Sequence, residues 1–162
     1  MSERTTALAD ELQRALDEVD RFIDEVSDEG WHAFSPGEQR TVAALICHIG
    51  ISNTGLLNTI IKPVAEGAPG PSYTAEDLHS WNAAAAQQYA AASKAEAREL
   101  LRSDASAAVA YVRELSDEQL GRSVEMALLP EPVTLEDTIA FVLAGHPRQH
   151  LASARAAAGM AD

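Results

Sequence analysis

The chain is poor in cysteine and in aromatic residues. Cys47 is the one cysteine among 162 residues, so an internal disulfide is excluded. A free cysteine fits the reducing cytoplasm, where we expect the protein to act. Aromatic residues make up 5% of the chain and β-branched runs are short. Since those residues pack best in strands, their scarcity disfavours a fold based on sheets.

Positive charge is also scarce, because 12 Lys and Arg face 25 Asp and Glu and give a formal net charge of −13. Such a surface repels phosphate backbones and anionic lipids, so we expect neither nucleic acid nor a membrane as a partner. The longest apolar run, Val42–Ile51, falls far short of the roughly 20 residues that span a bilayer. No apolar segment follows the N-terminal Met-Ser-Glu-Arg, and we expect no signal peptide.

What the chain does contain is alanine and helical periodicity. In Thr5–Val26, apolar residues recur at helical spacing and charges occupy the other face. A second helix is expected from about residue 38 or 40 to about residue 64, with Pro63 weakening its end. The intervening segment Trp31–Gln39 reads as a loop, because proline and glycine interrupt the pattern.

The second half of the chain shows capping patterns at Thr74, Ser93 and Thr134, each followed three residues later by an acidic residue. Ser93 either starts a new helix or lies within a longer one. Ser116–Leu120 adds at most one short turn, and Gly121–Val133 is irregular. We therefore predict one all-α domain over residues 1–162, a four-helix bundle with long connections after its second and third helices.

Three histidines are the candidate functional residues. His146 and His150 are four residues apart, so they share one face of the last helix, and this face continues that of Ile139 and Leu143. His48 lies inside the apolar run of the second helix. Imidazoles that converge in a core need partners, and a metal ion is the best one. Zn²⁺, Ni²⁺ or Fe²⁺ fits such a donor set, one ion per chain, and three protein ligands leave positions open for a substrate.

Alternatively, each histidine is a core residue that forms a hydrogen bond with a carbonyl group. The bundle would then not be an enzyme and would bind a small ligand or a partner. Pro147 directly follows His146, and a kink there would disturb the ligand geometry. Arg40 and Arg148 are cations close to the histidine-bearing segments, and either could bind an anionic group of a cofactor or substrate. Most such arginines form surface ion pairs instead.

The remaining candidates read as structural. Cys47 points about 100° away from its neighbour on a helix, so it is a small buried hydrophobe rather than a further ligand. We expect His32 and His79 to be solvated. Trp31 and Trp81 are expected to pack at the ends of the bundle, although either could line a pocket.

Two segments resemble the DinB-like family of metal-binding four-helix bundles. Residues 37–49, GEQRTVAALICHI, resemble the family's second-helix signature, and residues 134–137 and 146–151, TLED and HPRQHL, resemble its last helix. The resemblance covers nearly the whole chain. It implies a divalent metal held by His48, His146 and His150, and frequent homodimers.

Better-understood relatives use low-molecular-weight thiols such as mycothiol or bacillithiol, some as S-transferases and one branch as a maleylpyruvate isomerase. The resemblance therefore implies an enzyme that transfers such a thiol to a small electrophilic substrate. A metal-dependent hydrolase, in which a water activated by the metal attacks, is a further alternative.

Overall fold

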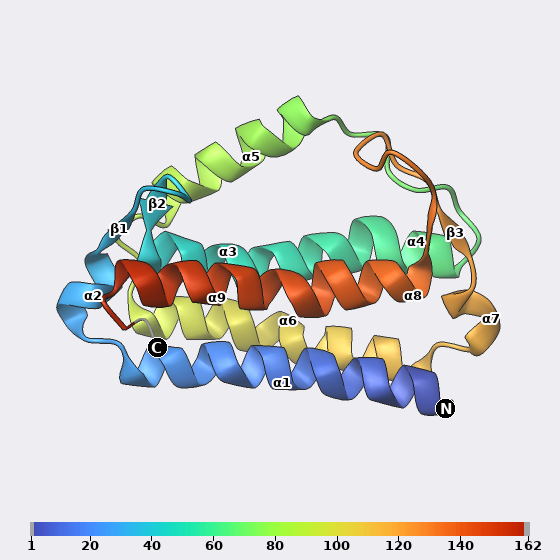
Figure 1. The fold of residues 1–162 in the computed structure, drawn as a ribbon, viewed down its shortest axis with the longest axis horizontal. Coiled ribbons are helices and arrows are strands. Elements are labelled where there is room, and N and C mark those ends of the chain that lie inside the picture. The colour runs from blue at the N-terminus through green and yellow to red at the C-terminus, as the bar shows by residue number, and fades with distance from the viewer. Residues whose placement is uncertain (1, 161–162) are drawn as a thin grey trace.

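Four long helices lie side by side, and a shorter helix arches over one side of them (Figure 1). The computed structural model describes residues 2–160, without the side chain of Asp104. The elements in chain order are α1 (Glu3–Glu25), α2 (Asp28–His32), β1 (Phe34–Ser35), β2 (Arg40–Thr41), α3 (Val42–Leu56), the π-helix η1 (Leu57–Ile61), α4 (Lys62–Ala65), α5 (Ala75–Gln88), α6 (Lys94–Glu114), α7 (Asp117–Leu120), β3 (Ser123–Val124), β4 (Val133–Thr134), α8 (Leu135–Thr138), the π-helix η2 (Ile139–Gly145) and α9 (His146–Ala157).

The bundle consists of α1, α3, α6 and the continuous rod formed by α8, η2 and α9. Helix α6 packs against α1 and α3, and the last rod packs against the same two helices on the other side. Figure 1 shows that α1 and α9 run in one direction and that α3 and α6 run in the other. The neighbours α3 and α6 are therefore parallel, so their connection must return along the bundle, and α5 lies within this return. The predicted all-α four-helix bundle with long connections after its second and third helices is confirmed.

Side-chain caps determine where the helices begin. Ser2, Thr41, Thr74, Ser93 and Thr134 each accept a hydrogen bond from the backbone N–H three residues further on. Such caps satisfy N–H groups that have no partner within the helix. The starts predicted from the capping patterns are confirmed, and the cap at Ser93 begins a new helix.

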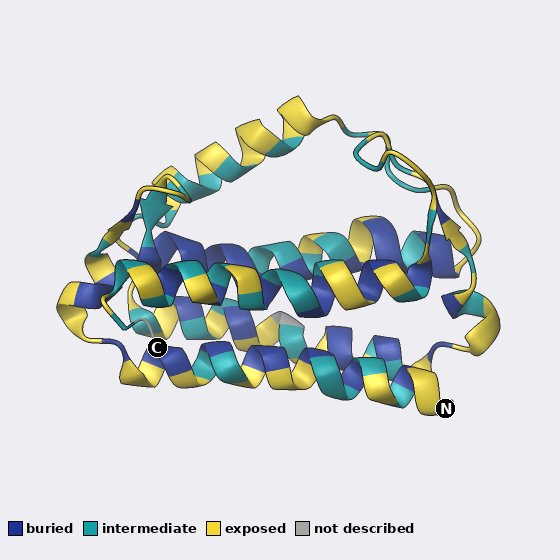
Figure 2. Cartoon of the chain, viewed as in Figure 1, coloured by how far each residue is buried: buried dark blue, intermediate teal, exposed yellow. Residues whose placement is uncertain are grey.

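Helix α3 is the most buried element of the bundle (Figure 2). Every residue from 42 to 50 is buried, because α6, α9 and α5 all pack against this helix. At Gly50 the backbones come close: a Cβ atom there would lie 2.9 Å from the carbonyl carbon of Leu100 in α6. The predicted inner face of α1 is confirmed as well, with Leu12, Leu16 and Val19 buried.

Helix α3 continues through η1 and α4, so residues Val42–Ala65 form 24 residues of uninterrupted helix. By length and composition alone this helix could cross a membrane, which differs from the prediction based on Val42–Ile51. Core helices of globular proteins pass the same test, and most of the apolar part of this helix is buried inside the bundle.

Three local predictions are corrected. The expected loop Trp31–Gln39 contains the end of α2, which begins where Ser27 accepts from the Gly30 N–H, and strand β1, which pairs antiparallel with β2. The irregular segment Gly121–Val133 contributes β3 and the start of β4 to a second antiparallel pair. Trp31 packs as expected and its Nε1 donates to the Ala92 carbonyl at 2.8 Å, but Trp81 is 55% exposed on α5.

Candidate metal site

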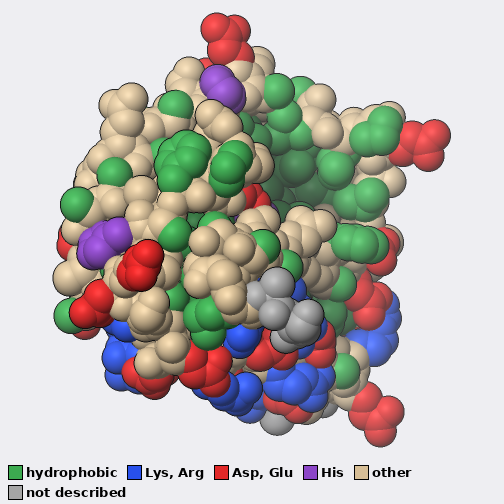
Figure 3. Space-filling view, turned by 60° about the vertical axis from the view of Figure 1, so that its left-hand side comes forward, with side chains coloured by type: hydrophobic (Ala, Val, Ile, Leu, Met, Phe, Trp, Pro, Cys, Tyr) green, Lys and Arg blue, Asp and Glu red, His purple; other side chains and the backbone are tan. Residues whose placement is uncertain are grey.

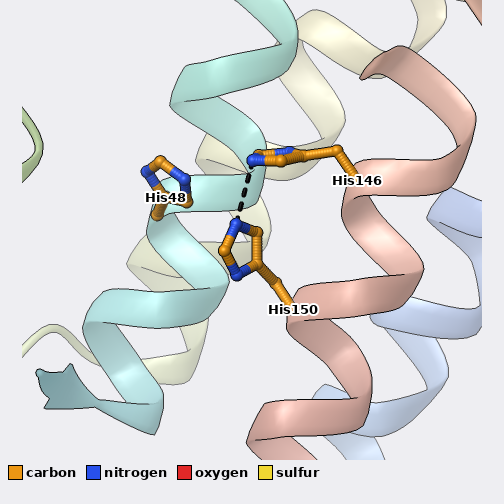
Figure 4. Close-up of side chains that lie close together, drawn as sticks. All are labelled: His48, His146 and His150. Atoms are coloured by element: carbon orange, nitrogen blue, oxygen red, sulfur yellow. Dashed lines mark hydrogen bonds between the residues drawn. The ribbon is translucent and has the colours of Figure 1, made fainter. Parts of the chain in front are cut away.

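Three histidines from two neighbouring helices point toward one another (Figure 4). His48 comes from α3, and His146 and His150 come from successive turns of α9. One ring nitrogen of each lies within 4.8 Å of the other two. The ring centroids are 5.2 Å apart for His48 and His146, 4.8 Å for His48 and His150, and 4.3 Å for the pair on α9. The structure thus brings together the three residues that the sequence proposed as ligands.

The hydrogen bonds of the histidine rings indicate which ring nitrogens have a lone pair available for a metal ion. The Nδ1 atom of His150 lies 3.1 Å from Oε1 of Glu38. Because a carboxylate only accepts hydrogen bonds, this nitrogen carries the proton, and Nε2 of the neutral ring keeps its lone pair. That Nε2 atom is 2.9 Å from Nε2 of His146, while Nδ1 of His146 is buried and has no partner among the described residues. The described fold therefore leaves this one nitrogen of the His146 ring unsatisfied.

Burial keeps His48 and His146 neutral. It lowers the pKa of His48 to about 3, and the charges that His146 and His150 would carry add to the effect. The pKa of His146 falls to about 4, mainly through burial and then through His150. The hydroxyl oxygen of Ser52, one turn after His48, lies 3.3 Å from both nitrogens of the His48 ring. At neutral pH His48 and His146 are thus neutral imidazoles, which is the form that binds metals.

Glu38 is the functional residue that the sequence did not reveal. It lies between β1 and β2, 112 residues before its partner His150. Burial opposes ionisation of its carboxyl, but hydrogen bonds from Ser153 and His150 and the charge of Arg40 outweigh it, so the pKa of Glu38 is lowered. Metal-ligating histidines usually donate their second N–H to such a carboxylate, which fixes tautomer and orientation. No spacing rule connects residues this far apart.

The donor set fits a divalent transition metal. Two nitrogens of a tetrahedral zinc site, with Zn–N of about 2.0–2.1 Å, lie about 3.3 Å apart. The 2.9 Å between the Nε2 atoms of His146 and His150 is close to that separation. The carboxylate behind His150 also fits a metal site, because it can hold Nε2 of His150 toward the ion. Three histidines on this geometry could hold a metal ion, and three ligands leave positions open for a small molecule.

Pro147 does not separate the three histidines, although the sequence suggested that a kink at this proline would disturb their geometry. The expected irregularity is present as η2, seven residues of π-helix that end at Gly145. The backbone N–H of His146 bonds to the carbonyl of Phe141, five residues back. His146 and His150 then occupy a regular α-helix and face α3.

The two candidate arginines have different surroundings. Arg148 points to α1, where its guanidinium pairs with Glu11 and Glu18. This position does not fit the anion-binding role beside the histidines that was considered for it. Arg40, which immediately precedes α3, lies close enough for its charge to lower the pKa values of His48 and His146. The structure thus associates only Arg40 with the histidine cluster.

The other candidates are structural or solvated as predicted. Cys47 is buried, and burial raises the pKa of its thiol to about 12, so it is a core residue and not a nucleophile. His32 and His79 are exposed.

Comparison with known proteins agrees with this architecture. A search of the curated proteins gave no match. Among solved structures, the chain resembles YfiT from Bacillus subtilis, described as a probable metal-dependent hydrolase with an unusual four-helix bundle topology. The two are 17% identical and superpose with a TM-score of 0.77 over 98% of this chain and 89% of YfiT, which shows a shared fold. The model of the DinB superfamily matches residues 11–154. The chain belongs to the DinB superfamily.

Proposed function

We propose that this protein is a metal-dependent enzyme that transfers a low-molecular-weight thiol, of the mycothiol or bacillithiol type, to a small electrophile. His48, His146 and His150 would hold one divalent ion, Zn²⁺, Ni²⁺ or Fe²⁺. A metal at this place supplies a Lewis acid that lowers the pKa of a coordinating thiol or water. The observation that carries the proposal is the convergence of three imidazoles, with the Glu38 carboxylate behind that of His150.

The chain's own residues contribute positioning. Glu38 orients His150, burial excludes water from His48, and the rigid helices α3 and α9 hold the ligand nitrogens in place. The Glu38 carboxylate contacts the cluster, and it is already hydrogen-bonded to Nδ1 of His150. Thiol addition needs no separate general base once the thiol is ionised, so this arrangement favours thiol transfer over hydrolysis.

A metal-dependent hydrolase is the second candidate, and the description of YfiT favours it. Hydrolysis would need a base to accept the proton of the attacking water, and Glu38 is the nearest group for this role. Turnover of ester or amide substrates without any thiol would identify the hydrolase. Turnover that requires a thiol would identify the transferase. A chain that binds no metal would point to the third possibility, a bundle that binds a ligand or partner without catalysis.

The first experiment is elemental analysis of the untagged protein beside a His146→Ala/His150→Ala variant. We expect about one divalent metal per chain in the wild type and none in the variant. A His32→Ala/His79→Ala variant is the matched control, because it removes two exposed histidines away from the cluster. Equal metal content in all three proteins would refute the assignment of the ligands. Thiol-transfer assays with the identified metal then test the reaction.

Two further properties belong to the same proposal. We expect a cytoplasmic protein, in keeping with its free Cys47. We also expect a homodimer, which sedimentation of the purified chain would test.

A further inference from the structure

Arg40 is unusual among the arginines of this acidic protein. Eight other arginines each have a nitrogen within 4.0 Å of a carboxylate oxygen. Arg21, which has no such partner among the described residues, is exposed to solvent. Arg40 is partly buried and has no carboxylate within that distance in the part of the chain that the structure describes. With 25 acidic residues available, the absence of a partner at a shielded site is informative.

Among the described residues, one nitrogen of the Arg40 guanidinium has a hydrogen-bond partner. This Nε donates to the backbone carbonyl of Glu38 at 3.1 Å. Nη1 is buried and has no partner in the same part of the chain. The nearby Glu38 carboxylate accepts a hydrogen bond from Nδ1 of His150, on the side of that ring away from His146. A buried donor without an acceptor costs free energy, so a ligand that supplies the acceptor would be stabilised at this position.

The charge of Arg40 lies close to the histidine cluster. Its Nε donates to the backbone carbonyl of Glu38, whose carboxylate lies 3.1 Å from Nδ1 of His150. Imidazoles that ligate a metal are neutral, so a divalent ion at the cluster would contribute two positive charges. Arg40 adds one and Glu38 removes one, so the occupied site has an excess of about two positive charges. One thiolate on the metal neutralises only one of them.

We propose that the site takes a small substrate that carries a carboxylate, and that Arg40 binds this group while the reacting end lies at the histidine cluster. A planar guanidinium matches a carboxylate with two parallel hydrogen bonds. Because Arg40 carries one positive charge and its buried Nη1 is free to donate, it suits a ligand group with a single negative charge. The inference rests on the proposed function, since it describes the substrate of the same site.

The test uses metal-loaded full-length protein and two probes, 3-mercaptopropionate and its neutral amide, 3-mercaptopropionamide. Their dissociation constants are measured by calorimetry for the wild type, Arg40→Gln and Arg21→Gln. Arg21→Gln removes the same charge from an exposed position and is the matched control. Metal content and circular dichroism are measured first, to establish that every variant is folded and loaded.

We expect the wild type and Arg21→Gln to prefer the acid over the amide by about 10-fold or more, which is typical of a charge-assisted pair. In Arg40→Gln the preference should fall to less than about threefold, with the affinity for the amide unchanged. Equal affinities for acid and amide in the wild type would overturn the inference and leave the metal-dependent thiol reaction intact. A preference that survives in Arg40→Gln would also overturn it, because the metal itself would then hold the carboxylate.

If neither thiol binds, the thiol-transfer function fails and the inference is tested separately. Propionate and propionamide then replace the thiols in the same three proteins. A preference for propionate that requires Arg40 supports carboxylate recognition, whereas the lack of a preference overturns it. Inorganic phosphate is titrated in parallel, and stronger binding of phosphate than of propionate through Arg40 would overturn the assignment to a carboxylate.

Discussion

Removal of the Glu38 carboxylate should weaken metal binding while the bundle stays folded. Glu38 accepts one hydrogen bond, 3.1 Å long, from Nδ1 of His150, and both side chains are largely shielded, with 21% and 15% of their surfaces accessible. A hydrogen bond to a charged group contributes about 1.5–3 kcal/mol, which corresponds to about 10- to 150-fold in affinity. The range of about 10- to 100-fold seen for partners of metal ligands agrees with this.

Two substitutions separate the charge of Glu38 from its hydrogen bond. The side-chain oxygen in Glu38→Gln can still accept from His150, so we expect a loss near the lower limit, about 10-fold. Glu38→Ala removes the acceptor and frees the ring to rotate or change tautomer, so we expect about 100-fold. Competition with a chromophoric chelator of known affinity measures both values at pH 7.

The control is Glu25→Ala. Glu25 also pairs with the last helix, through Arg155 at 3.4 Å, but it does not contact the histidines. Its loss should leave the metal affinity unchanged. An affinity for Glu38→Ala within threefold of the wild type would refute the reasoning that this carboxylate orients a ligand.

Three further outcomes test the burial and packing described above. In metal-free protein, His48 and His146 have pKa values lowered by burial to about 3 and about 4, below the ordinary 6.5. As the pH falls, the unfolded chain therefore takes up protons before the folded one. The free energy of unfolding should be at its full value above about pH 6.5 and should decrease as the pH falls toward 4 and then 3. A urea midpoint that does not depend on pH would contradict this. Gly50→Ala should destabilise the fold by about 1–3 kcal/mol in urea unfolding, because the new methyl group meets the α6 backbone. Trp31→Phe should cost about 1–3 kcal/mol, since the buried Ala92 carbonyl loses its donor; an unchanged midpoint in either variant would refute the corresponding contact.

The parts of the fold that sequence could predict depend on local chemistry. A cap at Thr74 or Thr134 requires only the residue and the three that follow it, and both helices begin where the pattern placed them. The spacing of His146 and His150 is likewise local, and burial of His48 follows from the apolar run around it. These local signals were enough to place three imidazoles on inner faces.

Contacts between distant segments could not be predicted in this way. Glu38 reaches His150 only because the β1–β2 turn lies beside α9, which is a consequence of the whole topology. Arg148 stands between the two histidines in the sequence, yet its position on the helix turns it toward Glu11 and Glu18 on α1. Of the two arginines that the sequence suggested, Arg148 is thus turned away from the site, because the packing of α9 between α1 and α3 decides which side chains reach it.

The two helix-interior prolines show why sequence predicted an irregularity but not its form. Pro63 and Pro147 each occupy the second position of an α-helical segment that follows a π-helix. A proline has no N–H, and its ring clashes with the carbonyl four residues earlier. In both places the residue before the proline bonds five residues back, to Leu57 or Phe141, so the preceding turn is wider. The wider turn makes room for the ring without breaking the rod in Figure 1, and for this reason the histidine after η2 still faces α3.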